Sequence, residues 1–166
     1  FSTLVFPGTH SKHIVCNDGK VRDFKTYMTG EMFHVISEYT ILKNSISKQD
    51  SNEGIDSFDE GLMRSQEDSS LLHDLFSIRA SDLTHTKTKT ENSYYLSGLL
   101  IGDEISALQS DTVQTIFLCA GGNLFNLYYR AFDKLGLLNK TIVIEKEVVD
   151  NSVIKGQYKV LVSSNN

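Results

Sequence analysis

The order of the predicted elements indicates an α/β protein with one mixed β-sheet and flanking helices. Three β-prone segments come first, then a helix and helical insertions, and finally a strand, a helix, a strand and a helix. Short turns join the early segments and helices join the later ones, which favours antiparallel and then parallel pairing in one sheet. The length of 166 residues fits about one domain.

The first strand is predicted over residues 3–6, because this β-prone run is stopped by Pro7-Gly8. Two further runs, 12–17 and 20–26, flank Asp18-Gly19. Asp-Gly at this place favours a type I′ hairpin turn, since both central residues need a positive φ.

The next element is a helix over residues 31–43, with Thr29 as its cap. Its apolar residues follow helical spacing at Met32, Val35, Ile36 and Tyr39. Residues 47–70 are polar and acidic and are expected to form a surface loop with a short helix around 58–64. Their charge indicates a solvated face rather than a cation site.

Two more helices are predicted over residues 70–83 and 93–109, with a mobile connector at 84–90. Gly98 and Gly102 lie four residues apart in the second of them. Each glycine costs a helix about 0.8–1 kcal/mol against alanine, so their presence indicates close packing on a neighbouring element. The residues expected to face inward are Leu96, Leu99, Leu100 and Ile105.

The last part of the chain returns to strand and helix. Residues 115–119 form a continuous apolar run, as expected for a buried strand. A helix capped by Asn123 and ended by Gly136 follows, then a strand at 142–144 and a helix over 152–162.

Composition and charge exclude several classes of protein. With 40% apolar residues the chain is not intrinsically disordered, and its longest apolar runs are too short for a membrane span. A net charge of -5 argues against nucleic acid as the main partner. Two isolated cysteines, Cys16 and Cys119, and no signal peptide predict a cytoplasmic protein. The chain starts at Phe1, so we expect it to be a piece of something longer.

The turn after the first strand is a candidate phosphate site. Gly8 allows a ligand to approach the backbone, while Thr9, Ser11 and the turn amides offer donors and Lys12 adds charge. A P-loop motif is absent. The alternative is an ordinary hairpin turn.

A second candidate is the turn from Cys119 to Asn123, where a strand leads through two glycines into a helix. Gly121 and Gly122 let a flat or anionic ligand lie against the backbone, and the helix start presents free amides. The alternative is a tight strand–helix turn, and the Rossmann glycine spacing is not met.

No metal site or nucleophilic triad is predicted. The five histidines form no His-x-x-x-His pair on a predicted helix, and no Gly-x-Ser-x-Gly elbow is present. Cys16 lies within a predicted strand and is interpreted as a packing residue.

Several segments together resemble the family of 2-dehydro-3-deoxygalactonokinases, and the resemblance runs over nearly the whole chain. Its most specific stretches are Pro-Gly-Thr-His-Ser-Lys at 7–12 and Leu-Ser-Gly-Leu-Leu-Ile-Gly at 96–102. His13 stands where an aromatic residue is expected, and Ala120-Gly121-Gly122 replaces a Gly-Ser-Pro-like turn. The supporting segments are 26–31, 75–80, 95–104 and 119–123.

The resemblance implies one lobe of an actin-like ATPase (ribonuclease H-like) fold, within the sugar kinase, hexokinase, Hsp70 and actin superfamily. Residues 1–166 would form the C-terminal, nucleotide-binding lobe of a two-lobe enzyme that uses ATP and Mg²⁺ to phosphorylate 2-dehydro-3-deoxygalactonate. The N-terminal lobe would supply the catalytic Asp and an Asp-x-Gly-Thr loop for Mg²⁺-phosphate, a motif absent from this sequence. This lobe would hold no catalytic residue and no metal ligand.

The resemblance also implies roles for the two turns. Gly8 and Thr9 would contact the β- and γ-phosphates, flanked by Ser11 and Lys12. Residues 29–31 would border the cleft without an assigned role. The residues expected near the adenosine are Gly121, Gly122 and Asn123.

Two other functions stay open at this point. One is a different sugar kinase of the same superfamily, and the other is a non-catalytic binding module that keeps the fold. An Asp-x-Gly-Thr loop encoded upstream of Phe1 would favour an enzyme, and its absence would favour the module.

Overall fold

A computed structural model describes residues 1–47, 53–67, 70–110 and 114–163. Its strands form one mixed sheet in the order β3-β2-β1-β4-β5, which confirms the predicted architecture. The strands are β1 (Ser2–Phe6), β2 (Ser11–Asn17), β3 (Lys20–Tyr27), β4 (Thr115–Leu118) and β5 (Thr141–Val143). The helices are α1 (Thr29–Tyr39), α2 (Ile55–Arg64), α3 (Leu71–Leu83), α4 (Lys89–Ile105), α5 (Gly122–Lys134) and α6 (Lys146–Ser163).

The central strand, β1, is antiparallel to β2 and parallel to β4. β2 and β3 are joined by the predicted hairpin, in which Asp18 has φ 51° and Gly19 has φ 69°. Both values match the positive φ that a type I′ turn requires. The prediction of the turn from Asp-Gly is therefore confirmed.

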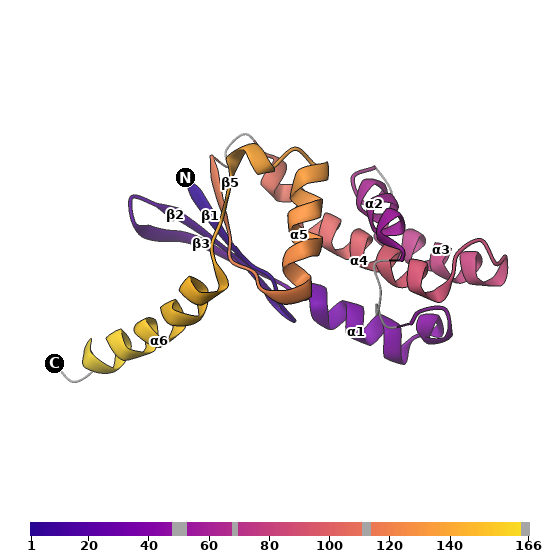
Figure 1. The fold of residues 1–166 in the computed structure, drawn as a ribbon, viewed down its shortest axis with the longest axis horizontal. Helices are drawn as coiled ribbons and strands as arrows, with labels where there is room; N and C mark the ends of the chain where they lie inside the picture. Colours follow the sequence, from indigo (N-terminus) through magenta and orange to yellow (C-terminus); the bar gives the residue numbers. More distant parts are fainter. Residues whose placement is uncertain (48–52, 68–69, 111–113, 164–166) are drawn as a thin grey trace.

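The helices α1 to α4 form one end of the molecule and the sheet forms the other, with α5 packed against the sheet (Figure 1). α4 is the central helix, because most of its residues are buried and it contributes to both apolar clusters. Ile101 and Ile105 join the cluster beneath the sheet, while Leu96 and Leu99 join the cluster with α1 and α3. The residues predicted to face inward from this helix are all buried.

The glycines of α4 allow α2 to lie against it, as their spacing predicts. A Cβ at Gly98 would lie 2.1 Å from the carbonyl oxygen of Phe58, and one at Gly61 would lie 2.2 Å from that of Tyr95. At both glycines the backbone of α2 lies directly against the backbone of α4. The short helix predicted around residues 58–64 begins earlier, at Ile55. It is also not a surface element, because Phe58 and Leu62 are fully buried.

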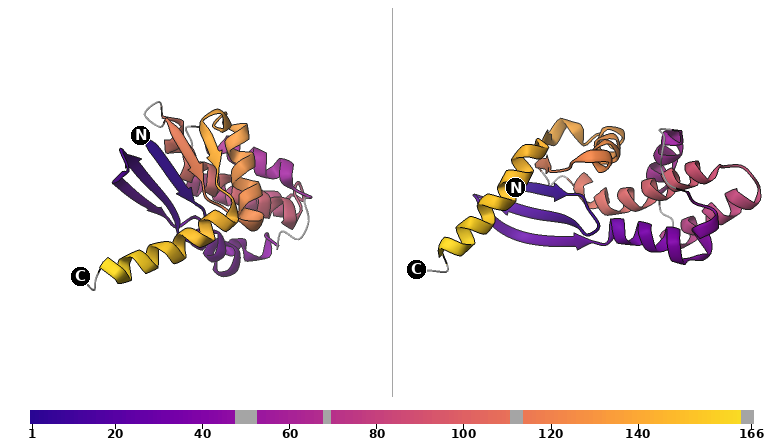
Figure 2. Two further views of the ribbon diagram at one scale, coloured as in Figure 1. Left: turned by 60° about the vertical axis from the view of Figure 1, so that its left-hand side comes forward. Right: turned by 60° about the horizontal axis from the view of Figure 1, so that its bottom comes forward.

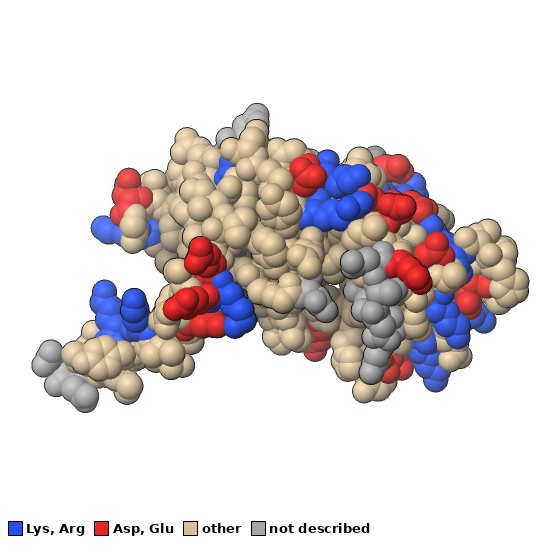
Figure 3. Space-filling model, viewed as in Figure 1, with Lys and Arg blue, Asp and Glu red and all other residues tan. Residues whose placement is uncertain are grey.

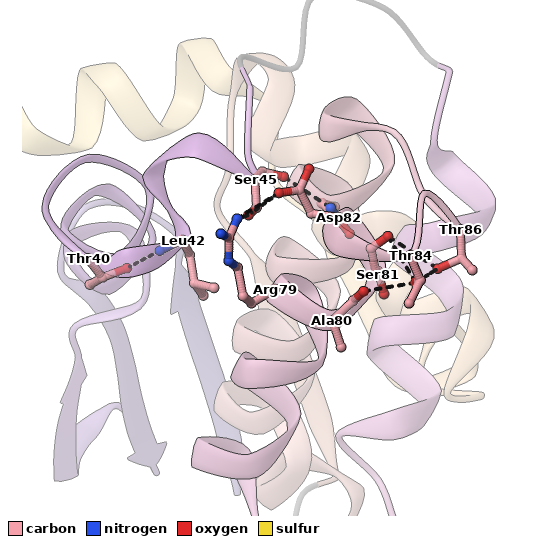
Figure 4. A network of polar contacts seen from close by, with 10 residues as sticks. Thr40, Leu42, Ser45, Arg79, Ala80, Ser81, Asp82, Thr84 and Thr86 are labelled. Atoms are coloured by element: carbon pink, nitrogen blue, oxygen red, sulfur yellow. Dashed lines mark hydrogen bonds and ion pairs between the residues drawn. The ribbon is translucent and has the colours of Figure 1, made fainter.

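A polar cluster fixes α3 to the short 3₁₀ segment that follows α1 (Figure 4). The Ser45 hydroxyl donates to Oδ2 of Asp82 over 2.8 Å, and the Arg79 guanidinium donates to the same oxygen over 2.9 Å. These contacts hold the helical end together far from the sheet. Together with Ile78, which is fully buried in the apolar cluster shared with α1 and α4, they anchor α3 although Leu72 and Phe76 are exposed.

Several predicted helix ends are wrong by a few residues. α1 begins after Met28 and ends at Tyr39, so Thr29 lies inside it, and its packing residues are Phe33 and Ile36. The expected stripe fails because Met32, Val35 and Tyr39 are exposed. The expected connector at 84–90 already holds the start of α4, where Thr88 and Glu91 form a capping box.

α6 projects away from the rest of the molecule and has no buried residue (Figures 1 and 2). It begins at Lys146 rather than at 152. On the face drawn in Figure 3, acidic and basic side chains are interspersed over the helical end. No helix within the described ranges is both long and apolar enough to cross a membrane.

Candidate functional site

The two predicted glycine turns leave the sheet at the same edge. β1 and β4 are parallel neighbours, with Val5 opposite Leu118, and the amide of Cys119 donates to the carbonyl of Val5 over 2.8 Å. The chain after each strand therefore emerges at the carboxyl edge of the sheet. In open α/β sheets this edge is where ligands bind.

Each turn borders its own hollow. Gly8 and Thr9 open onto a cavity of about 240 Å³ between the β1–β2 turn, α1, α4 and α5, which we call the turn cavity. Gly121 and Gly122 open onto a second hollow, also about 240 Å³, beside Phe125, Val143 and Lys146, which we call the edge hollow. The wall of the turn cavity is mainly apolar and includes Phe33, Leu100, Ile101, Leu124 and Leu127.

The β1–β2 turn is held by the first turn of α1. A Cβ on Gly30 would lie 2.8 Å from the carbonyl oxygen of Gly8, and the Glu31 amide donates to the carbonyl of Thr9 over 3.0 Å. In contrast, a Cβ on Gly8 would meet nothing within 4 Å, so the outer side of the turn is open. Thr9 is exposed, and its hydroxyl has no partner within the described residues.

A buried carboxylate lies beneath the turn cavity. Glu104 of α4 is 2% exposed, and its Oε1 accepts from the Ser11 hydroxyl over 2.6 Å and from Nε2 of His13 over 2.9 Å. Its Oε2 accepts from the Thr29 hydroxyl and, over 2.6 Å, from the Tyr128 hydroxyl. Burial alone would raise the pKa of Glu104, but these hydrogen bonds outweigh it and hold the pKa below its ordinary value.

This arrangement changes the roles predicted for two residues. Ser11 is fully buried and its hydroxyl is committed to Glu104, so it faces away from any ligand of the turn. Thr29 does not cap α1, because its hydroxyl also binds Glu104. Lys12 is half-buried, and its ammonium donates to the carbonyl of His10 over 2.9 Å, which keeps it near the turn.

An exposed pair sits beside Thr9. Nε2 of His10 lies 2.6 Å from Oε2 of Glu31, and both side chains are largely exposed. This contact adds a second tie between the β1–β2 turn and α1. Sequence reasoning named Glu31 as a border residue and gave His10 no role.

The second turn presents the start of α5. The helix is capped by the backbone of Gly121 and begins at Gly122, which has φ 63°. Asn123 is therefore not the N-cap, and its side chain lies outside the described part of the structure. A Cβ on Gly121 would lie 3.2 Å from Cδ of Lys146, so that lysine stem covers the turn on one side. The first amides of α5 still point toward the carboxyl edge.

The described residues contain no group of three or more His, Cys, Asp or Glu side chains that could hold a metal ion. Cys119 lies at the same edge but is buried, and burial raises the pKa of its thiol to about 11. A thiol in this state is a poor nucleophile.

Residues 2–155 match the sequence profile of the 2-keto-3-deoxy-galactonokinase family. The chain belongs to this family. It is 34% identical over 137 residues to the 2-dehydro-3-deoxygalactonokinase of Escherichia coli (strain K12), a match that covers 81% of this chain and 46% of the relative. It is 35% identical over 149 residues to a Rhizobium meliloti (strain 1021) protein named "Probable 2-dehydro-3-deoxygalactonokinase DgoK1", covering 87% and 49%.

A solved family structure agrees with the fold. A chain from Sinorhizobium meliloti described as a "putative 2-dehydro-3-deoxygalactonokinase protein" superposes with a TM-score of 0.83 and 31% identity. The match covers 96% of this chain and 52% of that one. The chain thus spans about half the length of the family members it matches, and its fold is that of a kinase family.

Glu104 and Tyr128 are the residues of this site that sequence reasoning missed. Glu104 lies inside one of the segments that carry the family resemblance, but that resemblance assigned it no role. Glu104 follows Leu100 by four residues and Ile101 by three, so helical spacing places this acidic residue on the apolar face, which is the signal that could have identified it. Tyr128 gives no such signal, because it reads as an ordinary core aromatic.

Proposed function

We propose that this chain is the nucleotide-binding, C-terminal lobe of a two-lobe kinase that phosphorylates 2-dehydro-3-deoxygalactonate with ATP. The observation that carries the proposal is the β1–β2 turn, which holds an uncommitted hydroxyl on Thr9 at the same carboxyl edge as the glycine turn before α5. Family membership favours a nucleotide as the ligand of this edge.

The phosphates would bind at the β1–β2 turn. Gly8 leaves space for close approach, and the Thr9 hydroxyl and the turn amides can donate to phosphate oxygens. The ammonium of Lys12 is near enough to the turn to add positive charge. Ser11 would support the turn from below instead of binding the ligand.

The adenosine would lie along the second turn. Gly121 and Gly122 give the edge hollow a backbone floor, and Phe125 and Val143 give it apolar sides. A flat base fits against such a surface, and the first amides of α5 favour the acceptor atoms of the nucleotide.

Mg²⁺ and the catalytic base would come from outside this chain. The described residues hold no carboxylate cluster for a metal, and Mg²⁺ in kinases is commonly held by phosphate oxygens with one or two carboxylates. Phosphoryl transfer depends mainly on positioning and charge stabilisation. The second lobe would complete the site by bringing the sugar acid, an Asp base and the remaining metal ligands to the nucleotide.

Nucleotide binding to the 166-residue chain tests the proposal directly. We expect saturable binding of a fluorescent N-methylanthraniloyl ADP in the presence of Mg²⁺, displaced by ATP. Gly8→Val should weaken it because the added side chain fills the open side of the turn, while Gly156→Val on exposed α6 should leave it unchanged. Absence of saturable binding would refute the proposed role of this lobe, and equal binding by both variants would move the phosphates away from this turn.

A further inference from the structure

We propose that Glu104 is the positioning residue of the phosphate-binding turn, holding β2, α1 and α5 in the arrangement that presents Thr9. This inference rests on the proposed function only for the identity of the ligand. The arrangement itself is seen in the hydrogen bonds of a single carboxylate.

Glu104 is bonded by donors from three different elements. Ser11 and His13 come from β2, Thr29 from α1 and Tyr128 from α5, while Glu104 itself is on α4. Each carboxylate oxygen accepts two of these bonds. The four elements that surround the turn cavity therefore meet at one buried group.

The donors from β2 and α1 lie close to the β1–β2 turn, so the carboxylate that binds them can also fix the position of the turn. Ser11 is two residues after Thr9, and Thr29 is directly before Gly30, whose backbone packs on Gly8 and Thr9. The turn therefore lies between the start of β2 and the start of α1, and both of these segments bond to Glu104. The pairing of Ser11 with Tyr27 between β2 and β3 and the Glu31 contacts also join these segments, and Glu104 adds the buried side-chain bonds between the start of β2 and the start of α1.

Glu104 also holds one wall of the turn cavity in place, through Tyr128. Its ring lines the turn cavity and its hydroxyl is bound from below by Glu104. Of the polar groups that line the cavity, Thr29 and Tyr128 are committed to the carboxylate, whereas Thr9 is not. Glu104 therefore holds two of the hydroxyls that line the cavity, those of Thr29 and Tyr128.

Packing alone does not explain a carboxylate at this place. A buried charge is costly, and an apolar side chain of similar volume commonly packs at least as well. The described structure places no Lys or Arg ion pair on Glu104, and neutral hydroxyls supply most of its bonds. Only a carboxylate offers about four acceptor sites in one plane to donors that converge from several directions.

The test compares Glu104→Gln with Asp59→Asn as a control. Asp59 joins α2 to α5 on the surface, so its loss weakens the fold without touching the turn. Amide hydrogen exchange at residues 8–10 and 29–31 is measured without any ligand, and binding of the fluorescent ADP with Mg²⁺ is measured separately. Both readouts are compared under conditions where the two variants have equal global stability.

We expect Glu104→Gln to speed exchange at these amides by about tenfold relative to Asp59→Asn. The dissociation constant for the nucleotide should rise by about tenfold, because the turn would no longer be held in its binding geometry. If Glu104→Gln does not fold, Thr29→Val and Tyr128→Phe each remove one donor and should give smaller changes of the same kind. Exchange that stays equal to the control in whichever of these variants fold would overturn the proposal.

The two readouts separate this inference from the proposed function. If the unaltered chain binds no nucleotide, the ligand assignment fails, and the exchange measurement still decides whether Glu104 positions the turn. If the chain binds nucleotide and Glu104→Gln binds it equally well with unchanged exchange, the positioning role fails and the proposed function stands.

Discussion

The hydroxyl of Tyr128 lies 2.6 Å from Oε2 of Glu104, which ties a wall of the turn cavity to the central helix α4. Burial and the adjacent carboxylate both raise the pKa of Tyr128, so the phenol stays protonated and donates at neutral pH. The contact links the packing of α5 to the polar group beneath the β1–β2 turn. Because the contact depends on the hydroxyl oxygen of Tyr128, removing that one atom tests it.

Tyr128→Phe removes that oxygen and leaves the ring in place. We expect the free energy of unfolding to fall by about 1.5–3 kcal/mol, the usual contribution of a hydrogen bond to a charged group. Chemical denaturation at pH 7 measures the change. Tyr129→Phe on the same helix is the matched control, because Tyr129 is exposed and its loss of a hydroxyl should leave stability unchanged.

Much of the fold is predictable from local patterns. The Asp18-Gly19 hairpin, the strand at 115–118 and the close approach of α2 to Gly98 depend on turn chemistry, apolar runs and glycine, and each leaves a mark in the sequence. Of the apolar stripe predicted for α1, Ile36 is buried but Met32, Val35 and Tyr39 are exposed, because helical spacing does not say which face a neighbour covers. The partner of that face, α4, lies more than fifty residues later in the chain.

The candidate site was only partly predictable for a related reason. Both glycine turns could be found locally, and parallel pairing of β1 with β4 brings them to one edge. Ser11, however, looks identical in sequence whether its hydroxyl faces a ligand or a buried partner. Glu104 lies 93 residues away from it, and nothing local to Ser11 shows that contact.

Gly98→Ala tests the contact between α2 and α4. The added Cβ would meet the carbonyl oxygen of Phe58 at 2.1 Å, and backbone cannot move aside as a flexible side chain can. We expect a loss of about 1–3 kcal/mol in the free energy of unfolding, in spite of the better helix propensity of alanine. Gly156→Ala on α6, where an added Cβ would meet nothing outside its own stretch of helix within 4 Å, should cause no loss.

Asp59→Asn tests the ion pairs that join α2 to α5. The carboxylate accepts from Arg130 at 2.6 and 2.7 Å and lies 2.6 Å from the Lys134 ammonium. Burial acts to raise the pKa of Asp59, but these hydrogen bonds prevail and lower it below 3.8. A lowered native pKa means that the pairing stabilises the fold fully above about pH 3.8 and that this contribution is lost as the pH falls through the native value.

The variant should therefore be less stable than the unaltered chain by about 1 kcal/mol at pH 7, a value that allows for solvent screening. This difference in stability between the variant and the unaltered chain should shrink in acid and also in high salt. Denaturation curves recorded across the acid range measure it. Asp56→Asn provides the control, since that side chain is fully exposed and 4.0 Å from Arg130, and a gap of constant size at all pH values would contradict the pairing.

Cys119 should react slowly with thiol reagents. With a pKa of about 11, roughly one thiol in 10³ is ionised at pH 8, and the side chain is buried as well. In a Cys16→Ser variant we expect the modification rate to rise about tenfold per pH unit and to jump on unfolding. Fast modification of the native chain at neutral pH would show that Cys119 is accessible and ionised.

The final prediction concerns Thr9 and the need for a second lobe. The 166 residues alone should show no turnover of 2-dehydro-3-deoxygalactonate with ATP and Mg²⁺, because the base and the metal loop would lie outside them. In the proposed two-lobe enzyme, Thr9→Ala should lower kcat, since it removes a hydroxyl of the turn that has no partner among the residues that the structure describes. Loss of such a donor costs up to about 10²–10³-fold at a preorganised site, and less where the contact is exposed, as Thr9 is.

Thr9→Ser is the matched comparison, because it keeps the hydroxyl and removes only the methyl group. If Thr9 donates to the transferring phosphate, Thr9→Ser should retain most of kcat while Thr9→Ala loses it, with no difference in stability between the two, because the side chain is exposed. Steady-state kinetics at saturating ATP measures both variants. Equal kcat in the alanine and serine variants would leave the β1–β2 turn as an ordinary hairpin, and turnover by the 166 residues alone would refute the two-lobe division of labour.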